Sequence, residues 1–229
     1  LWSWAFAFFA ALAMVWGAPV SAQVGPSPAE VARYTGVHAA AHRGDWPQLK
    51  KLLAAGADVN ARDAFGRTAV HIATFAKHGD VLRGLAQAGA KLELLENDRY
   101  DAVTIAAVAD DEPGLRLLLE LGASARLTTS RYDGTALIAA AHLGHDGVVK
   151  QLIAAGAPLD HVNNLHWTAM IESIVLGNGG PRHQEVLRAL LAAGASPRLT
   201  DGEGNTPLAL ARARNYSAMV LLLEKAGAK

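Results

Sequence analysis

A Gly-Ala dipeptide recurs through this chain at an almost constant spacing. It stands at 56–57, 89–90, 122–123, 156–157, 194–195 and 227–228, so successive copies are 33, 33, 34, 38 and 33 residues apart. A second landmark keeps the same period, 21 residues before each glycine or 26 in the fifth unit. It is Thr35, Thr68, Asp101, Thr135, Thr168 and Thr206, which we call the threonine position. A period of this length is typical of a solenoid, in which each repeat is one small unit packed on its neighbours.

Apolar residues predict two helices in every unit. The first follows the threonine position, as in Thr206-Pro207-Leu208, where proline suits the first helical turn. The second carries apolar residues 14, 17 and 18 places after the threonine position, and these spacings put them on one helical face. The Gly of each Gly-Ala pair should end that helix in the left-handed conformation, which glycine adopts at little cost.

These features together resemble the ankyrin repeat. The matching stretches are Asp63-Ala-Phe-Gly66-Arg-Thr68-Ala-Val-His71-Ile-Ala73, Asp201-Gly-Glu-Gly204-Asn-Thr206-Pro207-Leu208, Gly144-His145 and Gly56-Ala57-Asp58-Val59-Asn60. The resemblance covers about residues 33–229. It implies an all-α solenoid of about six helix-turn-helix repeats with β-hairpin-like fingers between them. The expected repeats are approximately 33–63, 64–96, 97–129, 130–163, 164–201 and 202–229.

Several units depart from the family pattern. The third has Arg99 and Asp101 in its glycine and threonine positions, which puts its turn geometry in question, and the fifth has an insertion at 178–182 between its helices. Glu224 replaces an apolar residue of the second helix in the last unit, as expected of a terminal cap with a polar outer face. The first unit begins at Tyr34 without a preceding finger motif and is predicted to be the N-terminal cap.

The first 22 residues predict an export signal. They contain no charged side chain, and small residues at Val20 and Ala22 fit a cleavage site before Gln23. An uncleaved membrane anchor is the alternative, because about 20 apolar residues can span a bilayer. Either interpretation places the folded part outside the cytoplasm, in the periplasm or secreted. Residues 23–32 are expected to form a short linker.

Composition narrows the possible functions. The 229 residues contain 21 Lys+Arg and 21 Asp+Glu, so the chain lacks the basic excess of a nucleic-acid binder. The absence of cysteine excludes disulfides, thiolate nucleophiles and Cys-bound zinc. None of the common hydrolase, metalloprotease or nucleotide-binding motifs is present. We therefore assign no catalytic residue and expect no cofactor.

Two alternative functions remain open from the sequence. The first is a metal-binding or enzymatic protein that uses His38, His42 and His71. His38 and His42 are four residues apart on one predicted helix, a spacing that can chelate a metal, and His71 repeats the position of His38 in the next unit. The second alternative is an envelope-associated structural role for a basic stripe, which could bind anionic surfaces. The stripe recurs at one position of the second helix and comprises Lys50, Arg83, Arg116, Lys150 and Arg188. Basic side chains near helix C-termini are also favoured by the helix dipole, which explains the stripe without a ligand.

The resemblance implies that a protein partner binds the concave face, formed by the finger tips and the exposed ends of the first helices. Carrying these positions over to this chain gives a candidate patch rich in aromatic residues, the type that most often dominates interface energy. The patch comprises Phe65, Arg67, Phe75, Tyr100, Tyr132, His142, Trp167 and Leu176. The leading hypothesis is a monomeric, non-catalytic protein-binding scaffold of the cell envelope. Inhibition or stabilisation of an exported enzyme or toxin would suit such a scaffold.

Overall fold

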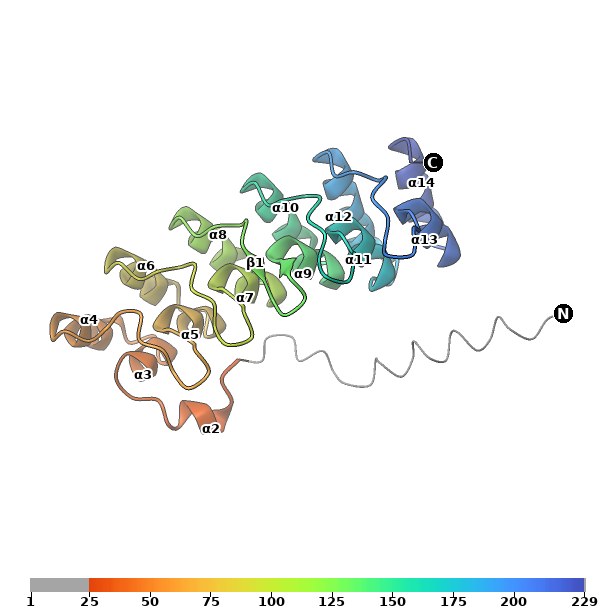
Figure 1. The fold of residues 1–229 in the computed structure, drawn as a ribbon. Helices are drawn as coiled ribbons and strands as arrows, with labels where there is room; N and C mark the ends of the chain where they lie inside the picture. Colours follow the sequence, from red (N-terminus) through yellow and green to blue (C-terminus); the bar gives the residue numbers. More distant parts are fainter. Residues whose placement is uncertain (1–24, 229) are drawn as a thin grey trace, which may run out of the picture.

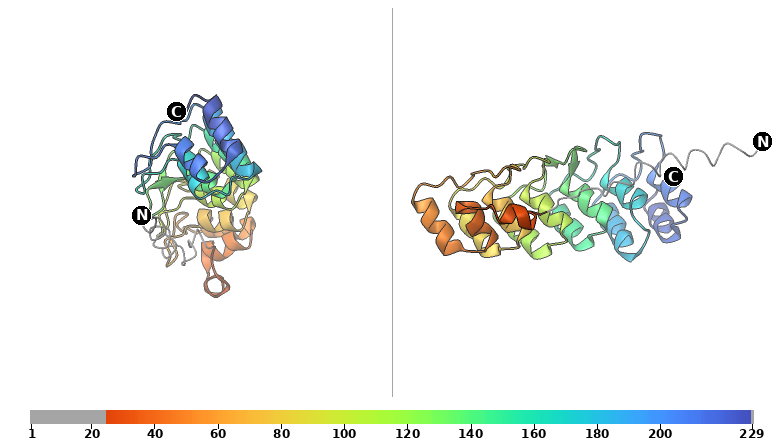
Figure 2. Two further views of the ribbon diagram at one scale, coloured as in Figure 1. Left: turned by 90° about the vertical axis from the view of Figure 1, so that its right-hand side faces the viewer. Right: turned by 90° about the horizontal axis from the view of Figure 1, so that it is seen from below.

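The computed structural model describes residues 25–228, which form six stacked helix pairs (Figure 1). The first helices of the repeats pack on one another as one layer, which we call inner, and the second helices form the outer layer. The inner helices are α3 (Gly36–His42), α5 (Ala69–Phe75), α7 (Ala102–Val108), α9 (Ala136–Leu143), α11 (Ala169–Val175) and α13 (Pro207–Ala213). The outer helices are α4 (Trp46–Ala54), α6 (Gly79–Gln87), α8 (Glu112–Glu120), α10 (Asp146–Ala154), α12 (Pro181–Ala192) and α14 (Ser217–Lys225). Figure 2 shows the helix pairs as a row, with the connecting loops along one edge.

The threonine position begins the inner helices as the sequence predicts. Thr135, Thr168 and Thr206 each accept a hydrogen bond on the side-chain oxygen from a backbone N–H in the first helical turn. Asp101 does the same at α7, because its carboxylate accepts from the Thr104 N–H at 2.9 Å. The departure in the third repeat therefore exchanges one helix cap for another.

Every glycine of the Gly-Ala pairs has a positive φ, between 78° and 93°. The expected left-handed helix ending is therefore confirmed in all six repeats. At the tips of the fingers, the position two residues before the threonine position is also left-handed, whether or not it is glycine. Its φ angles are 74° at Gly66, 67° at Arg99, 53° at Asp133, 60° at His166 and 84° at Gly204. The turn thus keeps one geometry in the third repeat despite Arg99.

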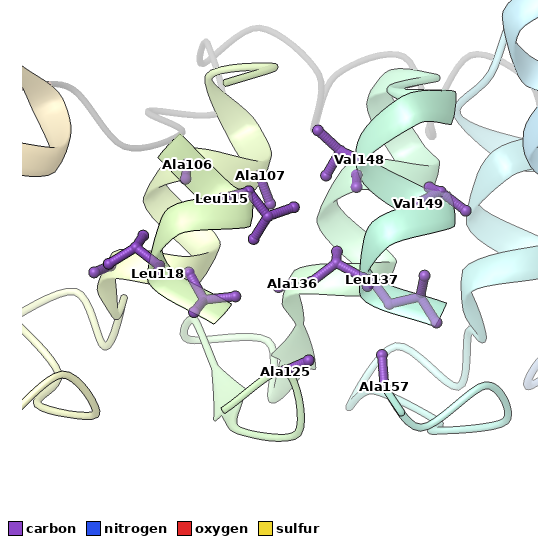
Figure 3. Packing of buried hydrophobic residues seen from close by; sticks show 14 of the residues in the cluster. Ala106, Ala107, Leu115, Leu118, Ala125, Ala136, Leu137, Val148, Val149 and Ala157 are labelled. Atoms are coloured by element: carbon purple, nitrogen blue, oxygen red, sulfur yellow. The ribbon is translucent and has the colours of Figure 1, made fainter. Parts of the chain in front are cut away.

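The core lies between the two layers and between successive repeats. Figure 3 shows side chains of α7, α8, α9 and α10 filling this space, among them the fully buried Ala106, Leu115, Leu137 and Val149. Alanines dominate the inner layer, and their small side chains allow neighbouring helices to approach closely. One pair of strands, β1 (Thr128–Thr129) and β2 (Gly134–Thr135), is antiparallel, with Thr128 facing Thr135. No helix in the described range is long and apolar enough to span a membrane.

The insertion in the fifth repeat lets one side chain connect three repeats. Arg182, in the first turn of α12, contacts Asp146 of the fourth repeat at 3.3 Å and Asp110 of the third at 2.8 Å. All three side chains are partly exposed, so each ion pair adds little stability by itself. The expected polar cap is also present, since the exposed Glu224 pairs with Arg212 of α13 at 2.6 Å.

The predicted linker contains ordered structure. Residues Pro28–Val31 form the helical turn α2, with Ser27 and Glu30 bonded to each other's backbone N–H in a capping box. The turn has only four residues, which is too short for hydrophobic periodicity to predict it. We call residues 25–34 the N-terminal strap. The predicted export signal at 1–22 lies outside the described residues.

The left-handed finger tips generate a prediction. His166→Gly should raise the free energy of unfolding by about 0.5–1 kcal/mol, because a non-glycine residue pays a steric cost in this conformation. Leu165→Gly is the matched control: Leu165 precedes His166 at the same exposed tip but lacks a positive φ, so glycine should give no gain there. Urea denaturation measures both variants, and equal effects of the two would contradict the explanation.

Candidate functional site

Backbone hydrogen bonds hold neighbouring fingers side by side. The N–H of Asn97 donates to Phe65 O at 3.0 Å, that of Ser130 to Arg99 O at 2.9 Å, and that of Asn164 to Tyr132 O at 2.9 Å. The finger tips of the second, third and fourth repeats are therefore each bonded to the next finger along the stack. Such a surface is preformed, and a partner would lose little conformational entropy in ordering it.

The structure distributes the eight predicted contact residues unevenly. Phe65 and Tyr132 lie on the finger tips with 45% and 41% of their surface exposed. Arg67 is only 4% exposed. The remaining five are partly buried: Phe75, Tyr100, His142, Trp167 and Leu176.

Arg67, one of the predicted contact residues, has its guanidinium already bound within the chain. Its Nε donates to Asp63 Oδ2 at 2.8 Å, and Nη2 lies 3.2 Å from Glu30 Oε2 of the N-terminal strap. The Phe65 ring covers the same group, with its centroid 4.4 Å from the guanidinium carbon. Tyr34 completes the cluster by donating its hydroxyl to Asp63 Oδ2 at 3.0 Å.

The strap also covers Phe75. A Cβ atom built on Gly25 would lie 3.2 Å from the Phe75 ring, so the strap backbone runs directly over this side chain. The second repeat therefore presents less free surface than the sequence predicts. Only the strap explains this difference, since it is the one described segment outside the repeat pattern that contacts these residues.

Sequence reasoning did not single out two residues of the fifth repeat that the structure makes prominent. Leu165 occupies the position equivalent to Phe65 and Tyr132 and is 43% exposed. Glu172 lies in the middle of α11, and its side chain is only 8% exposed. An acidic residue inside an otherwise apolar inner helix was the available sequence signal for Glu172.

Glu172 belongs to a polar cluster that joins a finger to two inner helices. Its Oε1 accepts a hydrogen bond from Asn163 Nδ2 at 2.8 Å, and its Oε2 lies 3.6 Å from His142 Nδ1 at the end of α9. The Asn163 side-chain oxygen Oδ1 accepts hydrogen bonds from the N–H groups of Leu165 and Trp167, each at 3.0 Å. The Asn163 side-chain amide thus places the buried Glu172 carboxyl beside the finger segment that carries Leu165 and Trp167.

Burial shifts the ionisation of this cluster. Loss of hydration raises the pKa of Glu172 to about 7, against the opposing effect of the Asn163 hydrogen bond. The pKa of His142 is lowered, first by burial and then by the nearby His183 and His145. Both groups therefore favour their neutral forms more than exposed ones would.

Two of the three histidines proposed as metal ligands, His38 and His71, bond to the protein backbone. His71 Nδ1 accepts the Thr68 N–H at 3.1 Å, so Nε2 carries the proton and donates to Tyr100 O at 3.2 Å. Burial lowers the pKa of His71 to about 4. His38 Nε2 lies 3.0 Å from Ala61 O, while the His42 ring lies beside Tyr34. Among residues 25–228 no three His, Asp or Glu side chains are grouped to hold an ion.

The basic stripe lies on the outer helices and all five of its residues are exposed. Two of them pair with acids of the same helix, Lys150 with Asp146 and Arg188 with Glu185, both at 3.2 Å. Local pairing of this kind reduces the net positive potential available to an anionic surface. The arrangement is typical of a solvated helix face.

Comparisons with known proteins agree with the fold. The family described as ankyrin repeats (three copies) matches residues 37–129, 115–201 and 137–229, and the chain belongs to this family. The ankyrin repeat protein YahD of Escherichia coli (strain K12) is 36% identical over 190 residues, covering 82% of this chain and 94% of that protein.

Solved structures extend the comparison. An ankyrin repeat domain from Acinetobacter baumannii is 42% identical with a TM-score of 0.80, covering 84% of this chain and 98% of that domain. The ankyrin repeat domain of Bcl-3, an IκB family member, is 26% identical with a TM-score of 0.76, covering 86% and 88% of the two chains. Ankyrin repeats generally bind protein partners and are generally non-catalytic, and nothing in these similarities indicates an enzyme.

The raised pKa of Glu172 generates a prediction about stability. The carboxyl holds its proton more tightly in the folded than in the unfolded chain, so its stabilising effect is complete below pH 4.5 and is lost as the pH rises to about 7. Glu172→Gln removes this loss. The variant should be close to wild type in stability at pH 4.5 and more stable by about 3 kcal/mol at pH 8, since one pKa unit is worth about 1.4 kcal/mol.

Urea denaturation between pH 4.5 and 8 measures the difference in unfolding free energy between Glu172→Gln and wild type. The titration of all other groups cancels in this difference. Glu93→Gln makes the same substitution at an exposed position and controls for the exchange of a carboxyl for an amide. A constant difference between Glu172→Gln and wild type across this range would reject the proposed ionisation.

Proposed function

We propose that this protein is a non-catalytic scaffold that binds a protein partner through the fingers and inner helices of repeats three to five. One observation supports this location of the binding surface. Six large apolar residues of the described chain are exposed, and Tyr132, Leu143, Val162 and Leu165 lie within the fourth repeat and the adjoining finger of the fifth. Clustering of exposed apolar side chains is typical of an interaction site, whereas single ones are common on any surface.

The strap argues against the first two repeats as the main contact. Its Glu30 pairs with Arg67 and its backbone covers Phe75, so a partner would have to displace bonds that the chain already makes. From the third repeat onward, Tyr100, Tyr132 and Trp167 remain available at least in part. The proposed surface therefore keeps five residues of the predicted patch: Tyr100, Tyr132, His142, Trp167 and Leu176.

We further propose that the protein acts as a monomer in the periplasm or outside the cell. The support is the uncharged apolar stretch at 1–22 with small residues before Gln23. Inhibition or stabilisation of an exported enzyme or toxin fits a rigid surface without catalytic groups. Binding would also stabilise the solenoid itself, since a ligand that binds only the folded state shifts the folding equilibrium.

The binding surface can be tested by capture from an envelope extract of the source organism. A protein retained on the immobilised chain should be lost with Tyr132→Ser/Leu165→Ser, because truncating central apolar anchors typically costs about 2 kcal/mol or more each. The control is Leu221→Ser, which removes an even more exposed apolar side chain from α14, on the outer layer. Equal loss in both variants, or in neither, would contradict the assignment of the surface.

The location can be tested by expressing the chain, preceded by an initiator methionine, in a Gram-negative bacterium. We expect the protein in the periplasmic fraction, with the mass of a chain that begins at Gln23. A full-length mass in the membrane fraction would instead support the uncleaved anchor. A full-length cytoplasmic product would reject export.

A further inference from the structure

Glu172 stands where the other repeats have apolar residues. Its position, four residues after the threonine position, is otherwise occupied by Ala39, Ile72, Ile105, Ala139 and Leu210. A buried carboxyl is costly unless a partner compensates it. The fifth repeat therefore carries an acidic group that the architecture of the stack does not require.

One oxygen of this carboxyl is left open. Oε1 accepts the Asn163 amide, but Oε2 accepts no hydrogen bond, and its nearest cationic candidate is His142 Nδ1 at 3.6 Å. Among residues 25–228, the one enclosed side-chain oxygen or nitrogen without a hydrogen bond is Gln151 Oε1. Oε2 of Glu172 is thus unbonded but keeps some contact with solvent, although the side chain is only 8% exposed.

The surrounding elements supply no permanent positive charge to Glu172. From α9 comes His142, whose pKa is lowered by burial and by the nearby His183 and His145. From α12 comes His183, whose ring nitrogens lie 2.9 Å from His142 O and 3.0 Å from Asn178 Oδ1. Arg214, after α13, donates to Val175 O at 3.0 Å. In the described chain, no lysine or arginine lies within 4 Å of the Glu172 carboxyl.

The second repeat shows how this face binds a guanidinium. There, Arg67 occupies the position directly before the threonine position, bonded to acidic side chains and covered by the Phe65 ring. In the fifth repeat the equivalent of Arg67 is Trp167 and that of Phe65 is Leu165. The position of Asp63 is held by Asn163, and the acid of the fifth repeat is instead Glu172 of α11, which has no arginine or lysine partner within the described chain.

We propose that Glu172 is the docking point for an arginine side chain of the protein partner. This inference rests on the proposed function and specifies its partner: a surface arginine flanked by apolar residues. The guanidinium donates to Glu172 Oε2, and its apolar surroundings pack on Tyr132, Leu165 and Trp167. Arginine fits better than lysine because its planar, weakly hydrated group both pairs with carboxylates and stacks on aromatic rings.

Docking is coupled to loss of a proton. Because Glu172 is ionised only above a pH of about 7, a guanidinium that binds its carboxylate at lower pH must first release that proton to solvent. Binding should therefore strengthen as the pH rises. From pH 5.5 to pH 8 the affinity should increase about tenfold or more, which is the change in the ionised fraction.

The test uses N-acetyl-arginine amide as the probe and N-acetyl-citrulline amide as its uncharged isostere. Nuclear magnetic resonance of the chain records the Trp167 indole N–H and the Glu172 carboxyl carbon during titration with each compound. At pH 8 the arginine probe should shift both signals saturably, with a weak affinity as expected for one side chain. The citrulline probe at pH 8, and the arginine probe at pH 5.5, should shift them at least tenfold less at equal concentration.

Glu172→Gln is the matched variant, since the amide keeps the shape of the side chain and removes its charge. It should abolish the response of the Trp167 signal to the arginine probe while the thermal transition stays cooperative. Equal responses to the two probes, an unchanged response in Glu172→Gln, or no saturable shift at pH 8 would each overturn the proposal. In the capture experiment, a partner lost with Tyr132→Ser/Leu165→Ser but fully retained by Glu172→Gln would overturn the arginine site and leave the scaffold function standing.

Discussion

Contact between neighbouring repeats is the constraint on which the rest of this structure depends. A single pair of short helices cannot bury its apolar face, so each repeat is stable only against the next. The alanines of the inner layer make this contact close, and polar bonds reinforce it at fixed positions. Four side chains bond to a backbone carbonyl oxygen at or just after the end of the preceding repeat's inner helix, at 2.9 to 3.0 Å. They are His78, His145, His183 and Tyr216. The stack is therefore held by equivalent bonds repeated along its length.

Because the positions repeat, the sequence predicts those features that each repeat must contain. The Gly-Ala period predicted the six helix pairs and the left-handed glycines, and the Glu224 cap is exposed as expected. Each of these depends on residues within one unit, where spacing alone determines the geometry. The finger turn at Arg99 was harder to predict, since the neighbouring fingers impose a conformation that arginine does not itself favour.

Features that depend on residues outside the repeat pattern were not predictable in this way. The strap has no periodicity, and its contact with Arg67 joins residues 37 positions apart. Arg67, which the family pattern places on the partner-facing surface, is thereby buried in an ion cluster. Glu172 was missed for a related reason: its burial and its hydrogen bond follow from how the finger and two inner helices meet, which spacing along the chain does not reveal.

Glu172 and Asn163 are coupled departures from the repeat pattern. The position of Asn163, five residues before the threonine position, holds Asp63, Glu96, Ser130 and Asp201 in the other fingers, where a side-chain oxygen accepts the backbone N–H groups that form the turn. Asparagine keeps that oxygen and adds an N–H₂ group, which donates to Glu172. An aspartate there would place a second carboxyl oxygen about 2.8 Å from Glu172 and oppose its ionisation. Asn163 thus holds an ionisable carboxyl at the proposed partner surface and still accepts the N–H groups that form the finger turn.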